Sequence, residues 1–257
     1  MFEWNSHVAA IWRPKSAHLR AVKRLDPIAL DQLLGIDRQK QALVANTEGF
    51  LAGHPANNVL LWGSRGTGKS SLIKALLNAY AERGLRMLEI DKDDLVDLPD
   101  IVDHLRELPQ RFIVFCDDLS FEAGETGFNH LKSVLEGSLE LPPENVLLYA
   151  TSNRRHLIPE HMQENLETQI VNGELHFGDS IEEKLSLADR FGLWLSFHPN
   201  TMDQYLAIVD DLFHAYDTLP DELHREAKQF AQSRASKSGR TARQFFQEHQ
   251  IRHEDLF

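Results

Sequence analysis

The feature that most constrains this chain is a glycine-rich run between an apolar segment and a helical one. The run satisfies the pattern G-x-x-x-x-G-K-[ST] at every fixed position and reads Gly63, Ser64, Arg65, Gly66, Thr67, Gly68, Lys69, Ser70. The backbone N–H groups of such a loop surround a phosphate, the lysine reaches the β- and γ-phosphates, and a hydroxyl such as that of Ser70 ligates Mg²⁺. A chance glycine-rich turn is the alternative, and the placement between a strand and a helix disfavours it. We therefore expect this loop, with Ser71 after it, to bind a nucleotide.

Short apolar runs alternate with helical patterns along the first 200 residues. The runs are almost continuously hydrophobic, as expected for parallel strands that are covered on both faces. The expected strands cover residues 59–62, 86–90, 112–116, 146–150 and 192–197. The sequence thus predicts an α/β fold with a five-stranded parallel sheet between helices.

The pattern of apolar residues changes from strand-like to helical after the fifth expected strand. Thr201 and Gln204 form a predicted capping box, and apolar residues then follow a helical stripe to Tyr216. Further helices are expected over 220–233 and 241–249, and no strand signal follows. We therefore expect an N-terminal segment (1–30), an α/β nucleotide-binding core (31–198) and a small helical lid subdomain (199–257).

Composition limits the possible partners and location. Of 257 residues, 42% are hydrophobic, which is enough for a real core, and the formal charge is −12, which disfavours direct binding of nucleic acid. No run has the length of a membrane span or the pattern of a signal peptide, so a cytoplasmic location without membrane contact is expected. The single cysteine, Cys116, lies inside an apolar run and is interpreted as a buried small hydrophobe.

Two acidic residues follow the third expected strand. A P-loop site needs a carboxylate at the end of a different strand to hold the metal ion, and Asp117 fits this role together with Ser70. Asp118 is the candidate for polarising the attacking water. A pair of solvated acids at a strand end is the alternative. The sequence therefore predicts Mg²⁺ and a nucleoside triphosphate as cofactors, and the scattered histidines indicate no other metal.

These motifs together resemble those of the AAA+ ATPases. The resemblance implies that Asn153, after the fourth strand, holds the attacking water or the γ-phosphate; the alternative is an asparagine selected for a turn. It also implies that Arg190, in the segment 187–192, is an arginine finger directed at the ATP of a neighbouring subunit. A surface ion pair of Arg190 is the alternative there.

The resemblance extends to the lid and to the base site. In the run 238–245 it implies an arginine that folds over the phosphates, with Arg243 preferred and Arg240 as its competitor, against a simple solvated basic face. Upstream, the run 34–39 implies that Ile36 packs against the adenine, and plain core packing is the alternative. The lysine, the two acids, Asn153, Arg190 and the lid arginine are then the expected catalytic set.

Within this class, the runs 57–63, 91–95 and 150–157 are similar to an uncharacterised family of stand-alone bacterial AAA+ proteins.

The sequence departs from the general AAA+ pattern at two places. The metal-binding strand ends in Asp117-Asp118 instead of Asp-Glu, which shortens the expected base by one methylene. The loop after the second strand is acidic and lacks the aromatic residue followed by glycine that polypeptide-threading members carry.

Three functions follow as hypotheses. The first is an ATP-hydrolysing factor, assembled as a homo-oligomeric ring with six subunits expected, that remodels or loads an unknown macromolecule such as a protein. The second is an ATP-dependent binding switch with negligible hydrolysis, and the third is a nucleotide-gated helper of the helicase-loading or transposition type. A GTPase is disfavoured because no [NT]-K-x-D motif is present. A small-molecule kinase would not need the Asn153, Arg190 and Arg243 positions in this order.

Overall fold

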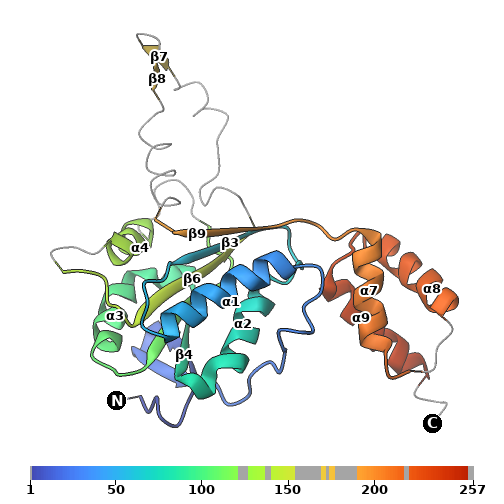
Figure 1. Ribbon diagram of the computed structural model, residues 1–257, viewed down its shortest axis with the longest axis horizontal. Coiled ribbons are helices and arrows are strands. Elements are labelled where there is room, and N and C mark those ends of the chain that lie inside the picture. Colours follow the sequence, from blue (N-terminus) through green and yellow to red (C-terminus); the bar gives the residue numbers. More distant parts are fainter. Residues whose placement is uncertain are drawn as a thin grey trace.

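A parallel sheet covered by helices on both faces forms the larger part of the molecule, and a bundle of three helices follows it (Figure 1). The computed structural model describes residues 2–120, 127–136, 140–153, 169–171, 174–176, 190–216 and 220–253. Within these ranges, no helix combines the length and the apolar character needed to cross a membrane.

The main sheet has seven strands in the order β2-β1-β4-β5-β6-β3-β9. Its strands are β1 (Ala9–Arg13), β2 (His18–Ala21), β3 (Val59–Gly63), β4 (Leu85–Ile90), β5 (Arg111–Cys116), β6 (Val146–Ser152) and β9 (Leu193–Phe197). All neighbours are parallel except β1 and β2. A separate antiparallel pair consists of β7 (Gln169–Val171) and β8 (Glu174–His176).

The predicted α/β class and all five predicted strands are confirmed, but the strand count of five is wrong. The N-terminal segment adds two strands, because β1 pairs in parallel with the edge of β4, with Ala10 opposite Leu88. Side chains fix this addition: Trp4 is buried in the core, and the Trp12 indole N–H donates to Asp97 Oδ2 at 2.8 Å. Both tryptophans therefore dock the segment onto its own core.

Helices α1 (Asp37–Leu51) and α2 (Lys69–Tyr80) cover one face of the sheet. The helical segment expected after the P-loop is present as α2 and the 3₁₀ turn η2 (Ala81–Arg83), and it ends at Gly84 in the left-handed conformation. The buried Leu72, Ile73 and Leu76 place the apolar stripe of α2 against the strands. Since α2 begins at Lys69, this packing fixes the direction of the P-loop lysine.

The other face is covered by η3 (Lys92–Asp97), α3 (Leu98–Arg106) and α4 (Gly127–Glu136). Leu131 and Leu135 of α4 are buried there. Cys116 is fully buried, and desolvation raises the pKa of its thiol far above the usual range. The interpretation as an apolar core residue is consistent with this.

The C-terminal helices are α7 (Met202–Phe213), α8 (Pro220–Ser233) and α9 (Gly239–His253). The predicted capping box at Thr201 and Gln204 is formed with both of its hydrogen bonds. These helices have a core of their own around Tyr205, Phe213 and Phe245. They stand beside the carboxyl ends of β3 and β9, where the chain crosses from the sheet (Figure 1).

Candidate functional site

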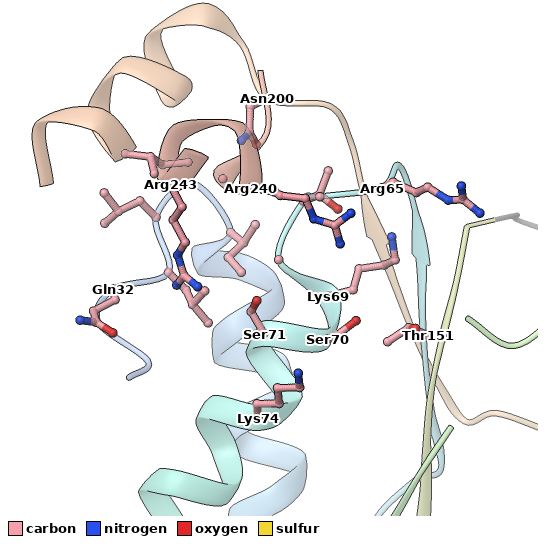
Figure 2. A pocket seen from close by; sticks show the side chains of 18 of the residues that line it. Gln32, Arg65, Lys69, Ser70, Ser71, Lys74, Thr151, Asn200, Arg240 and Arg243 are labelled. Carbon is pink, nitrogen blue, oxygen red and sulfur yellow. The ribbon is translucent and has the colours of Figure 1, made fainter. Parts of the chain in front are cut away.

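A cavity of about 830 Å³ lies at the carboxyl ends of the strands, between the core and the C-terminal helices. Ligands of open α/β sheets bind at this edge. The P-loop forms its floor, the segment before α1 one wall, and α7 and α9 the opposite wall (Figure 2). Its lining includes Gln32, Leu33, Leu34, Ile36, Arg65, Gly66, Thr67, Gly68, Lys69, Ser70, Ser71, Lys74, Asp117, Asp118, Thr151, Asn153, Asn200, Ile208, Asp211, Leu212, Gly239, Arg240, Arg243, Gln244 and Gln247.

The P-loop is anchored to the last strand of the sheet. Gly63 has φ +133°, and a Cβ built on it would lie 1.9 Å from the carbonyl oxygen of Phe197, so only glycine fits there. The Ser64 N–H donates to the same oxygen at 3.1 Å, and the Thr67 hydroxyl donates to the Ser64 carbonyl at 2.8 Å. Gly63 and Ser64 thus lie beneath the cavity, which the loop enters at Arg65.

Lys69 is buried and its ammonium group is held by oxygens. Its Nζ donates to the carbonyl oxygens of Gly63 at 2.8 Å and Ser64 at 2.7 Å, and to Asn153 Oδ1 at 3.3 Å. Burial lowers the pKa of Lys69; Asp117 and Asp118 oppose this shift, and Arg65 adds to it. A phosphate entering the cavity would favour the charged ammonium that burial disfavours.

The two acids meet the P-loop as the sequence predicts. Asp117 Oδ1 accepts from the Ser70 hydroxyl at 2.7 Å and also from the Thr151 hydroxyl. This pair of hard oxygen donors fits Mg²⁺, which takes a few protein oxygens and completes its shell with phosphate and water. Among the described residues, no group of three or more His, Cys, Asp or Glu side chains could hold a metal ion.

Asp118 faces the cavity with both carboxylate oxygens engaged. Asn153 Nδ2 donates to Oδ1, and Arg65 Nη2 lies 3.6 Å from Oδ2. The backbone of Asp118 is left-handed, with φ +54°. Asn153 therefore bridges Lys69 and Asp118, an arrangement that needs both the oxygen and the nitrogen of an amide.

The far end of the cavity is apolar and suits a nucleobase. Leu33, Leu34 and Ile36 line one wall, and Ile208 and Leu212 of α7 line the other. Ile36 is only 7% exposed, and it is shared between the core and the cavity lining. Core packing and contact with a base are thus compatible at this residue.

Both candidate lid arginines line the cavity, and they are directed to different parts of it. In Figure 2, Arg240 directs its guanidinium group toward Lys69, whereas Arg243 reaches toward the space between Gln32 and Ser71. The lid also contacts the loop directly, because Gly239 N–H donates to the Gly66 carbonyl at 3.2 Å.

Arg190 is not part of the cavity lining. It precedes β9, at the amino end of the strand, and its guanidinium group pairs with Glu136 of α4. The structure therefore separates Arg190 from the P-loop of its own chain. Residues 187–189, which belong to the proposed finger segment, lie outside the described residues, as do residues 154–157 after Asn153.

Several cavity residues were missed by sequence reasoning. Thr151 lies one position after the strand end that was predicted, Lys74 is one helical turn beyond Ser70, and Asn200 is the second residue of the expected lid. The signal for Lys74 was available, since residues i and i+4 share a helix face. Asp211 and Gln32 come from segments whose meeting depends on the tertiary fold.

Comparisons with known proteins agree with the fold. The family model described as "Protein of unknown function (DUF815)" matches residues 5–253. Two solved variants of RuvB from Thermotoga maritima are each 14% identical with a TM-score of 0.51, and the match covers 86% of this chain and 72% of theirs. A third RuvB variant from the same organism is 15% identical with a TM-score of 0.51, over 87% and 73% of the two chains. No curated protein matches the sequence.

Proposed function

The chain belongs to the family described as Protein of unknown function (DUF815) and has the fold of the AAA+ P-loop ATPases, and from this premise we propose that it binds Mg-ATP and hydrolyses it at an interface between subunits. The observation that carries the proposal is the convergence of Lys69, Ser70, Asp117, Asp118 and Asn153 on one cavity that the helical lid closes.

Each of these residues has a role that its position supports. The N–H groups of the P-loop and the Lys69 ammonium bind the β- and γ-phosphates. Ser70 and Asp117 would hold Mg²⁺, which when bound neutralises charge on the transferring phosphoryl group. Asp118 and Asn153 orient the attacking water, and a carboxylate oxygen of Asp118 accepts its proton. The apolar end at Ile36 holds the adenine.

The two lid arginines support a division of roles. Arg240 directs its charge to the side of Lys69 and suits the terminal phosphates, which favours it over Arg243 for that task. Arg243, with Ser71 and Lys74 near its end of the cavity, suits the α-phosphate and ribose.

Hydrolysis would be completed by a second subunit in a ring. Arg190 lies away from the P-loop of its own chain, so it can stabilise phosphoryl charge only in a neighbour's cavity. Turnover would then drive remodelling or loading of a macromolecule by movement of the lid.

One observation favours the nucleotide switch as a second candidate. Asn153 and Arg65 both contact the carboxylate of Asp118, and a short aspartate restrained in this way reaches an attacking water less readily than a longer glutamate would. A switch would bind Mg-ATP with the same residues and turn it over negligibly.

Calorimetric titration with the non-hydrolysable analogue AMP-PNP and Mg²⁺ tests nucleotide binding itself. Wild type should bind AMP-PNP and bind the GTP analogue more weakly, and Lys69→Met should lose at least about 100-fold in affinity because a charge-assisted phosphate contact is removed. Since Lys69 is buried with a lowered pKa, the methionine variant should remain folded by circular dichroism. Equal binding by wild type and the variant would contradict the proposed site.

A further inference from the structure

Thr151 contacts both acidic residues of the site, although the sequence motifs assign it no role. It lies on β6, opposite Leu61 of β3, and is 2% exposed. We propose that Thr151 is a positioning residue for the metal site, which sets the geometry of Asp117 and Asp118 together. This inference rests on the proposed function and names the residue on which its Mg²⁺ dependence relies.

The contact with Asp117 restrains the metal-binding carboxylate. The Thr151 hydroxyl donates a hydrogen bond to Asp117 Oδ1, the oxygen that also accepts a hydrogen bond from Ser70. A hydrogen bond from a hydroxyl to a carboxylate is among the stronger protein hydrogen bonds. Because Thr151 is buried, bulk water is poorly placed to replace its hydroxyl. Two donors from two different elements therefore fix the rotation of one carboxylate.

The hydroxyl oxygen of Thr151 also accepts a hydrogen bond from Asp118, the residue after Asp117. The Asp118 N–H donates to Thr151 Oγ1 at 2.9 Å, and the Leu119 N–H donates to the Thr151 carbonyl at 2.6 Å. The ladder between β5 and β6 ends where Cys116 is opposite Ala150, so Thr151 continues the connection one position further with its side chain.

This connection supports an unfavourable backbone conformation. Asp118 has φ +54°, and the left-handed region costs a residue with a Cβ about 1 kcal/mol, although aspartate tolerates it better than most. Held in this turn, Asp118 directs its carboxylate to Asn153. The short aspartate in place of glutamate at this position is consistent with a turn that Thr151 holds in place.

Threonine combines two properties that the position uses. Its hydroxyl donates to one acid and accepts from the N–H of the next, and its β-branch restricts χ1, so the hydroxyl is held in one direction. Serine would keep the hydroxyl with more freedom, and valine would keep the shape without the hydroxyl.

The test compares Thr151→Val with Thr151→Ser and with a matched buried control, Thr47→Val. Thr47 is fully buried, donates to the Leu43 carbonyl at 2.8 Å and bonds Tyr149 Oη at 2.9 Å, and it does not line the cavity. For each protein, the affinity for AMP-PNP is measured with excess Mg²⁺ and again with EDTA, and thermal unfolding is followed by circular dichroism. The ratio of the two affinities reports the metal-linked part of binding without turnover.

We expect the ratio of the two affinities to be about 10-fold smaller in Thr151→Val than in wild type, because residues that orient metal ligands typically have effects of this size. Thr151→Ser, which keeps the hydroxyl, should have a ratio close to that of wild type. Thr47→Val should lower stability and leave the ratio unchanged. If wild type binds AMP-PNP more tightly with Mg²⁺ and Thr151→Val has the same ratio as wild type, the role of Thr151 is contradicted while the proposed function stands. If wild type shows no metal-linked binding, the proposed function fails and the inference fails with it.

Discussion

At the scale of single residues, the site depends on side chains that join opposite charges. Asn153 is the clearest case, since its oxygen accepts from Lys69 at 3.3 Å and its nitrogen donates to Asp118. An amide is the only common short side chain with a donor and an acceptor in this geometry. The sequence predicted Asn153 near the phosphates, and the structure places it in the cavity lining, where it also restrains the candidate base.

Asn153→Asp should therefore harm the site more than Asn153→Ala. The new carboxylate would face Asp118 without a proton to donate, and the two like charges would repel each other. We expect affinity for Mg-AMP-PNP to fall about 10-fold below that of the alanine variant at neutral pH. Because protonation restores a donor, the deficit should shrink as the pH falls. Identical affinities of the two variants across the pH range would contradict the bridging role.

At the scale of elements, the P-loop is coupled to the lid through backbone contact. Gly66 has φ +75°, its carbonyl accepts from Gly239 at the start of α9, and a Cβ on it would lie 2.6 Å from Ser238 Cβ. Loop and lid are therefore in direct contact at this point.

Gly66→Ala should lower the free energy of unfolding more than the same substitution at another glycine with positive φ. Gly84 is the matched control, because it has φ +93° and nothing within 4 Å of its added Cβ. We expect about 1 kcal/mol of lost unfolding free energy for Gly84→Ala and about 1–3 kcal/mol more for Gly66→Ala, from overpacking against the lid. Chemical denaturation measures both. In the double variant Gly66→Ala/Ser238→Gly, the extra loss of unfolding free energy should disappear. Equal losses for Gly66→Ala and Gly84→Ala would contradict the contact between the P-loop and the lid.

Elements with strong local signals were predicted well, and those that depend on distant pairing were not. Helix α2 has an apolar stripe, a P-loop before it and a glycine after it, so local signals in the sequence mark both of its ends. Strand β1 contains Trp12 and Arg13 and joins the sheet only through β4, over 70 residues away in the chain. Thr151 was missed for a similar reason, since its partners belong to a neighbouring strand.

At the scale of the whole molecule, charge is distributed unevenly. The chain carries a formal charge of −12, yet the cavity is lined by more cations than acids. The cations are Arg65, Lys69, Lys74, Arg240 and Arg243, and the acids are Asp117, Asp118 and Asp211. The cavity therefore offers a local attraction for a polyphosphate on a protein whose overall field repels one.

The position of Arg190 makes assembly the central question. Outside the cavity of its own chain and paired with Glu136, it can contribute to hydrolysis only if another subunit presents its nucleotide there. The most direct measurement is the rate of phosphate release from Mg-ATP per subunit, as protein concentration rises from well below to well above the micromolar range. A specific activity that rises with concentration and is lost in Arg190→Ala is the predicted result. A specific activity that stays constant over the whole range, or no turnover at any concentration, would contradict hydrolysis at a subunit interface.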